Sequence, residues 1–258
     1  MSNFEYLLIL FSFNSVILIS LIVISIDRKS PRILLKFFFL PVLLTLFLGM
    51  SLQLQSEISD MSLRQAFANL IVTICCLRSF NTYSSIKSFL LQEFLLSIRD
   101  LIHRRKFLVI LIAVLRISFV QIFCFSSALS LNYLSGYSAL NFIDILGISI
   151  CFFGISIEVI CERKIKETKH NENKFIKTGP WSYIRHPNLA GLLLLFFGLQ
   201  LIALSGVGSQ WSVFGFIMTL IIIFKELIPL IERQLLAKYP DYEKYRDATP
   251  ILPAFLRR

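Results

Sequence analysis

Long apolar runs constrain this chain more than any other feature. A helix needs about 20 mainly apolar residues to cross the hydrocarbon core of a bilayer, and seven stretches of the sequence are candidates for such a span. They cover residues 4–26, 33–54, 64–77, 107–134, 142–161, 188–207 and 211–231, of which the third is the weakest. The sequence therefore predicts an all-α, polytopic membrane protein of about seven transmembrane helices.

The composition agrees with a surface that faces lipid. Charged residues make up 16% of the chain and the mean hydropathy is +0.73, whereas an average soluble domain has about 25% charged residues. Such values exclude a disordered chain, a collagen-like fibre and a disulfide scaffold. We detect no internal repeat and no low-complexity linker, so we predict one integral membrane domain over residues 1–258.

The cysteines and histidines point to neither a disulfide framework nor a metal site. The five cysteines are odd in number, lack paired spacing and lie within or at the ends of the apolar runs. His103, His170 and His186 cannot form an i, i+4 pair on one helix, and no carboxylate stands at ligand spacing beside them. We therefore expect no metal.

The excess of basic residues predicts the orientation of the chain in the membrane. Lys and Arg number 26 and Asp and Glu 16, which gives a net charge of +10. The bases gather after the first run, between the third and fourth, between the fifth and sixth, and after the seventh, whereas the other loops have almost none. Basic loops face the cytosol. We therefore predict an outside N-terminus, a cytosolic C-terminus and no nucleic-acid partner, in a bacterial inner membrane or an endoplasmic reticulum.

One cytosolic segment, residues 158–191, is richer in polar and aromatic residues than orientation requires. A Thr-Gly-Pro turn interrupts it, and Pro187 suits the first turn of the sixth helix, where a free N–H is not needed. A helix N-terminus attracts anions through its free N–H groups and its dipole. An ordinary interfacial belt is the alternative. The residues expected around this helix end are Trp181, Tyr183, Arg185, His186 and Asn188.

A second cytosolic segment, residues 225–253, contains three tyrosines spaced three residues apart. Tyr239, Tyr242 and Tyr245 share one helix face with Arg246 beside them. The segment is either a helix lying at the interface or a lid that closes over a nucleotide held by the first segment. Near the start of this segment, Glu226 and Glu232 would be costly inside the membrane unless they are paired.

These motifs resemble a known membrane family. The run from Thr178 to Asn188, TGPWSYIRHPN, is similar to the Gly-x-Trp-x-Tyr-x-Arg-His-Pro-Asn core of the steroid 5-alpha-reductases, the sterol reductases and bacterial relatives of the DUF1295 type. Arg64-Gln65 and Leu77-Arg78 at the ends of the third run also match. Further matches near the C-terminus are Pro229, Glu232, Tyr242, Tyr245, Thr249 and Pro253. The reductase-like portion is residues 64–253.

The resemblance implies an enzyme. Its members have seven spans and use NADPH to reduce a carbon–carbon double bond conjugated to a ketone in a lipid or steroid-like substrate. Glu57 and Tyr133 are the candidate donors to the enolate oxygen that develops during such a reaction. The residues that the resemblance implies for cofactor binding are Arg78, Glu162, Lys169, Trp181, Tyr183, Arg185, His186, Asn188, Tyr242, Tyr245 and Arg246.

Two alternatives remain open. The isoprenylcysteine carboxyl methyltransferases, which use S-adenosylmethionine, share the Gly-Pro, the Arg-His-Pro and a following glycine, but Asn188 and Trp181 favour the reductases. The chain also has Leu189 and Leu192 where the reductase relatives usually carry an aromatic ring and a carboxylate. A degenerate, non-catalytic homologue is therefore the third hypothesis.

Overall fold

Helices form all the regular structure in the residues that the computed structural model describes, which are 3–27, 40–54, 62–85, 107–134, 139–168, 175–206 and 210–251. The α-helices are α1 (Asn3–Asp27), α3 (Leu40–Leu54), α4 (Leu63–Ser85), α6 (Phe107–Cys124), α7 (Ser126–Leu134), α8 (Phe142–Thr168), α9 (Pro187–Leu204), α10 (Val213–Ile221), α11 (Ile228–Lys238) and α12 (Tyr242–Ala248). The described chain also contains three short helical turns. Two are 3-10 turns, η1 (Gly179–Ser182) and η2 (Gln210–Ser212), and the third is a π-helical turn, η3 (Ile222–Leu227).

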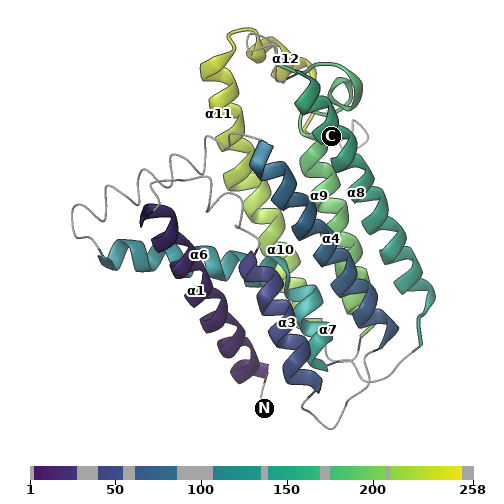
Figure 1. Ribbon diagram of the computed structural model, residues 1–258. Helices are drawn as coiled ribbons and strands as arrows, with labels where there is room; N and C mark the ends of the chain where they lie inside the picture. Colours follow the sequence, from purple (N-terminus) through teal and green to yellow (C-terminus); the bar gives the residue numbers. More distant parts are fainter. Residues whose placement is uncertain are drawn as a thin grey trace.

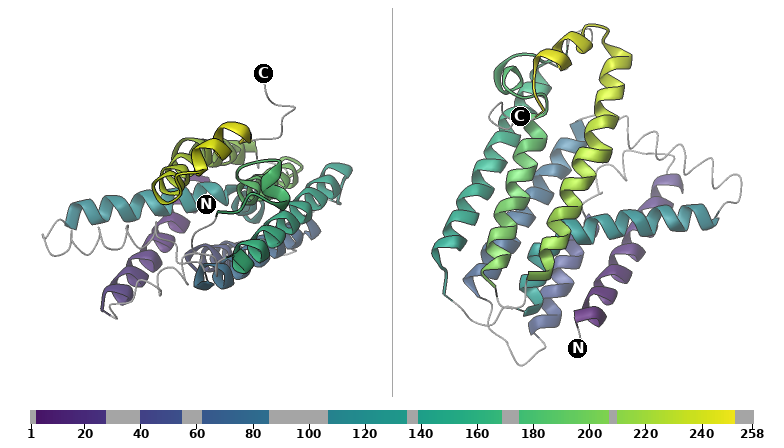
Figure 2. Two further views of the ribbon diagram at one scale, coloured as in Figure 1. Left: turned by 90° about the horizontal axis from the view of Figure 1, so that it is seen from above. Right: turned by 180° about the vertical axis from the view of Figure 1, so that it is seen from behind.

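Most of these helices stand side by side in one bundle. In Figure 1, α3, α4, α8, α9 and the rod formed by α10, η3 and α11 run along the same general direction, and α12 crosses one end of the bundle. The other views show α6 lying crosswise to these helices (Figure 2). The apolar core is shared by α1, α3, α4, α6, α7, α8 and α9.

Three stretches of the described chain are long and apolar enough to cross a membrane. They are Phe142–Thr168, Pro187–Leu204 and Gln210–Lys238, which correspond to the last three expected spans. Shorter apolar helices occupy Leu8–Ile24 and Leu40–Ser51. The all-helical fold is thus confirmed, and the three stretches are consistent with an integral membrane protein. By length and composition, the described residues supply fewer spans than the seven expected.

The prediction of one continuous span over residues 107–134 is wrong. The chain bends at Phe125, between α6 and α7, and α6 runs crosswise instead of along the bundle (Figure 1). Serines after the bend bind other helices: Ser126 Oγ donates to the Ser212 carbonyl at 3.2 Å, and Ser127 Oγ to Gln200 Oε1 at 3.0 Å. An apolar run reports burial or lipid contact but not the direction of the helix, so the sequence did not reveal the bend.

Glycines bring α8 and α9 into backbone contact. A Cβ atom added at Gly154 would lie 2.6 Å from the Gly191 carbonyl oxygen, and one added at Gly147 would lie 2.7 Å from that of Gly198. Small residues allow such close approach of helices in a membrane, where packing and polar contacts replace the hydrophobic driving force. The two helices therefore form a rigid pair that supports both ends of the bundle.

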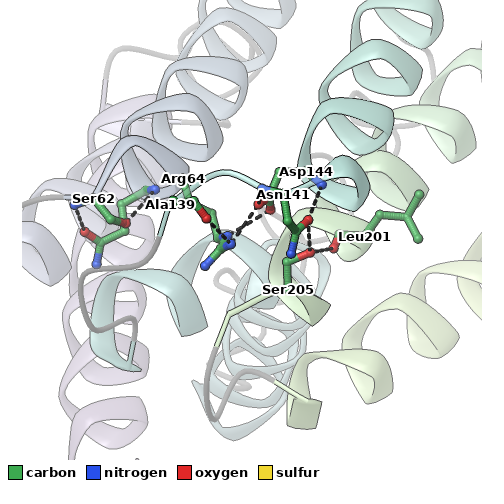
Figure 3. Close-up of polar contacts among 8 residues, drawn as sticks. Ser62, Arg64, Ala139, Asn141, Asp144, Leu201 and Ser205 are labelled. Carbon is green, nitrogen blue, oxygen red and sulfur yellow. Dashed lines mark hydrogen bonds and ion pairs between the residues drawn. The ribbon is translucent and has the colours of Figure 1, made fainter.

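A buried ion pair ties α4 to α8 at the end of the bundle opposite α12 (Figures 1 and 3). Arg64 Nε and Nη2 donate to the two carboxylate oxygens of Asp144 at 2.8 and 2.7 Å, and the side chains are only 1% and 0% exposed. Asn141 and Asp144 cap α8 reciprocally, each backbone N–H donating to the other's side chain, at 2.8 and 3.0 Å. Ser205, after α9, donates to Asn141 Oδ1 at 3.3 Å, so the network joins three helices.

Candidate functional site

A tight turn leads into the N-terminus of α9 and places its charged residues. Gly179 adopts a positive φ of 69°, which favours glycine, and the 3-10 turn η1 follows at once. Pro187 then starts α9 as its first residue, where the missing N–H costs nothing. The turn and the helix start that we expected from the sequence are both present, and Arg185 and His186 immediately precede the helix.

Glu232 of α11 binds both of these residues. Arg185 Nη1 donates to Glu232 Oε1 at 2.6 Å, and His186 Nε2 lies 3.2 Å from the same oxygen. All three side chains are largely buried. The sequence indicated that Glu232 needs a partner, and the structure provides two. The site residues expected from the sequence did not include Glu232. A carboxylate near the end of an expected membrane span nevertheless indicates a functional residue.

Burial disfavours the charged form of His186 in this cluster. Burial lowers the pKa of His186, and the hydrogen bond and charge of Glu232 offset only part of that effect. A neutral imidazole has one N–H, so Nε2–H donates to Glu232 and Nδ1 is left as an acceptor. Arg185 Nε has no hydrogen-bond partner in the described part of the chain.

A second charged cluster lies between α4 and α8. Arg78 forms ion pairs with both Glu158 and Glu162, and all three side chains are mostly buried. Arg78 and Glu162 were expected as cofactor-binding residues, and the structure brings them together. Glu158 was missed. It belongs to a row of buried α8 residues at alternating spacings of three and four, which includes Gly147, Cys151, Gly154 and Cys161.

Aromatic side chains cover the end of the bundle beside these clusters. The Phe175 ring contacts the rings of Tyr239, Tyr242 and Tyr245, with centroids 5.2 to 5.7 Å apart. Tyr245 Oη donates to the Trp181 carbonyl at 2.7 Å. This contact holds α12 against η1. The lid expected from the sequence would take the same position over the site.

Two of these tyrosines carry protonated phenols, and one of them, Tyr242, has an uncommitted hydroxyl. Burial raises the pKa of Tyr242 and of Tyr245 to about 12, so both phenols stay protonated at neutral pH. Tyr242 is fully buried, and its hydroxyl has no hydrogen-bond partner among the described residues. Tyr242 also interacts electrostatically with Glu232 and Arg185, so its unsatisfied hydroxyl lies near the charged cluster.

Other expected site residues lie apart from this group. Tyr183 is 77% exposed, and Arg246 is half-buried and pairs with Asp247 and Glu243 of its own helix. Asn188 is half-buried in the first turn of α9, and its side chain makes no hydrogen bond to a described residue. Glu57 and Lys169 lie outside the described residues, and only the backbone of Tyr133, in α7, is described.

The family described as "Protein of unknown function (DUF1295)" matches residues 95–249. The chain belongs to the DUF1295 family. This family is linked to steroid 5-alpha-reductase-like proteins, so the resemblance found in the sequence is confirmed at the level of the family. No curated protein and no solved structure matches the chain significantly.

Within this DUF1295 chain, the two leucines that depart from the reductase pattern are packing residues. Leu189 is buried in a small apolar cluster with Ile223 and Ile228, and Leu192 packs against the same cluster and against the main core. An aromatic ring or a carboxylate at these positions would have to displace side chains of η3 and α11. Apolar packing between α9 and the last span thus accounts for both leucines.

Proposed function

We propose that this DUF1295 protein is a membrane-embedded, NADPH-dependent reductase of a carbon–carbon double bond conjugated to a ketone in a lipid or steroid-like substrate. The family match supports the proposal, because DUF1295 is linked to steroid 5-alpha-reductase-like proteins. The Arg-His-Pro-Asn core supports it further. Bound NADPH would supply the hydride, and the enzyme would supply the binding groups and a proton donor.

The observation that carries the proposal is the convergence of Arg185, His186 and Glu232 beneath the docked α12 helix. The motif of α9 and the late motif of α11 are 46 or 47 residues apart in the chain and meet at 2.6 and 3.2 Å. Tyr242 adds an unsatisfied buried donor. Side chains of these kinds suit a dinucleotide, whose phosphates accept hydrogen bonds from guanidinium groups, helix N-termini and phenols.

In this proposal Arg185, Asn188 and the free N–H groups of the first turn of α9 bind phosphate, and Trp181, Tyr242 and Tyr245 cover the nucleotide. Arg185 and Arg78 now face carboxylates, so each would exchange a carboxylate for a phosphate when the cofactor binds. Lys169, Glu162, His186, Tyr183 and Arg246 remain secondary candidates. Glu57 and Tyr133 remain the candidates for the enolate donor.

The same proposal assigns the site to the cytosolic side of the membrane. Basic residues border this end of the bundle, including Arg163, Lys164 and Lys166 near the end of α8 and Lys177 before η1. Cytosolic loops are enriched in such bases. A soluble nucleotide would then reach the site from the cytosol, and an apolar substrate would come from the bilayer.

One observation favours a second function, transfer of a methyl group from S-adenosylmethionine. Three carboxylates, Glu158, Glu162 and Glu232, face only two arginines in the two charged clusters. This excess of negative charge and the nearby tyrosine rings suit a sulfonium cation better than a polyphosphate. A non-catalytic homologue, suggested by Leu189 and Leu192, would bind neither cofactor.

Ligand-induced thermal stabilisation separates these functions, because a ligand that binds only the folded state raises its stability. At 100 times its Kd, NADPH should stabilise the purified protein by about 2.7 kcal/mol. The Asn188→Ala variant should weaken this response without lowering the melting temperature of the free protein, because the Asn188 side chain makes no hydrogen bond to a described residue. Arg163→Ala, on the exposed side of α8, is the matched control and should respond like the native chain.

Two other responses to the cofactors would contradict the reductase proposal. Stabilisation by S-adenosylmethionine and not by NADPH would replace the reductase with the methyltransferase. No response to either cofactor would identify a non-catalytic homologue.

A further inference from the structure

The Phe175 ring lies among the three tyrosines of the C-terminal segment. Its centroid is 5.2 to 5.7 Å from the ring centroids of Tyr239, Tyr242 and Tyr245, at interplanar angles of 49° to 77°. Flat rings prefer such tilted and edge-on contacts. Lys177 Nζ is 4.6 Å from the same centroid, a distance at which an ammonium is attracted to the face of a ring. Three tyrosine rings and one cation therefore surround a single phenyl ring.

Ring contacts are the main attachment of Phe175 to the described part of the molecule. Residues 175–177 belong to no helix, and they make no hydrogen bond to another described residue. Phe175 is only half-buried, and Lys177, Thr178 and Gly179 are exposed. Segments with few buried contacts and no hydrogen bonds open at low free energy. The ring can therefore leave the tyrosines while the helical bundle stays intact.

The tyrosine rings connect the place of Phe175 to the charged cluster of the site. Tyr242 contacts the Phe175 ring and also interacts electrostatically with Glu232 and Arg185. Its buried hydroxyl has no hydrogen-bond partner among the described residues. Tyr245 likewise interacts with both the Phe175 ring and Arg185. A flat ring in this place would thus lie near the guanidinium proposed to bind phosphate, as the base of a nucleotide lies near its phosphate.

We propose that the Phe175 ring occupies the binding place of the cofactor's adenine base and leaves it when the cofactor binds. Adenine belongs to both NADPH and S-adenosylmethionine, so this base site rests on the proposed function but not on which of the two cofactors binds. Aromatic side chains bind bases through their π faces. The Lys177 ammonium, which lies over the Phe175 ring, then lies over the base as a cation–π partner.

Binding of adenosine 5′-monophosphate (AMP) to the detergent-solubilised chain tests the base site. This probe has the adenine and one phosphate but the reactive group of neither cofactor. Because only the fraction of protein with a displaced ring can bind, the apparent Kd equals the intrinsic Kd divided by that fraction. Phe175→Ala removes the competing ring and should tighten the Kd measured by isothermal titration calorimetry about tenfold. Phe214→Ala, at an exposed ring on α10, is the matched control and should bind AMP like the native chain.

A fluorescent replacement tests the displacement directly. Phe175→Trp keeps a ring among the tyrosines, so it preserves the ring contacts if Phe175→Ala fails to fold. Saturating AMP should shift the emission of this tryptophan to longer wavelength, because the indole moves into water. Nicotinamide mononucleotide, which has no adenine, should cause no shift. The native chain, whose tryptophans are Trp181 and Trp211, gives the background emission.

Three outcomes would overturn the base site: an AMP affinity of Phe175→Ala no higher than that of the native chain, the same gain with Phe214→Ala, or no emission shift at saturating AMP. If one of these is found while NADPH still stabilises the protein, the reductase stands without this base site. If AMP binds as expected while NADPH does not stabilise the protein, the base site stands and the reductase proposal fails.

Discussion

The Arg64–Asp144 ion pair offers the sharpest test of what holds the helices together. Asp144→Asn keeps the shape of the side chain but leaves the Arg64 guanidinium buried without a carboxylate. Removing one partner of a buried ion pair costs about 3–5 kcal/mol, and the exposed fractions of 1% and 0% place this pair in that class. For a chain of this size, about 2–4 °C of melting temperature is lost per kcal/mol. The variant should therefore melt about 6–20 °C below the native protein.

A thiol-reactive fluorophore can follow this melting in detergent, because four of the five cysteines are buried and react only on unfolding. The double variant Arg64→Met and Asp144→Asn removes the uncompensated charge, so it should melt above Asp144→Asn alone. Glu243→Gln is the control, since its pair with Arg246 is exposed and such pairs contribute at most about 1 kcal/mol. If Asp144→Asn melts within about 2 °C of the native chain, the pair does not lock α4 to α8.

Three further predictions use the same assay. Glu232→Gln should cost about 2 kcal/mol, because it weakens the charge-assisted hydrogen bond from Arg185, and an unchanged melting temperature would contradict this contact. Gly154→Ala should cost about 1–3 kcal/mol, since its Cβ would lie 2.6 Å from the Gly191 carbonyl, whereas Ser156→Ala on the exposed side of α8 should be neutral. Burial lowers the pKa of His186 below its ordinary value of 6.5, so below pH 6.5 the unfolded chain binds a proton that the folded chain does not. Stability should then fall as the pH drops from 6.5 towards the folded pKa, and His186→Asn should reduce this slope.

Local chemistry made the α9 end of the site predictable. Gly179 and Pro180 mark a turn and Pro187 marks a helix start, because glycine and proline restrict the backbone wherever they stand. The structure has η1 and α9 at these places. The expected need of Glu232 for a partner was also confirmed, since it followed from the cost of an isolated charge in a membrane.

Contacts between distant helices were not predictable. Arg64 and Asp144 are 80 positions apart, and nothing in either local sequence indicates the other. The pairing of Arg78 with Glu158 and Glu162 depends in the same way on how α4 packs against α8. The bend at Phe125 has neither proline nor glycine beside it. Serine hydrogen bonds to α9 and η2 follow the bend directly, and only the folded chain reveals them.

The glycine contacts between α8 and α9 bear on the order in which the molecule assembles. These two helices are neighbours in the chain, and their backbones meet at Gly154 and Gly191 without help from other helices. We expect them to pair as a helical hairpin during synthesis, before α11 is made. Arg185 and His186 are joined to Glu232 only after α11 emerges. The charged cluster at the end of the bundle is then the last part of the protein to form, on a hairpin already in place.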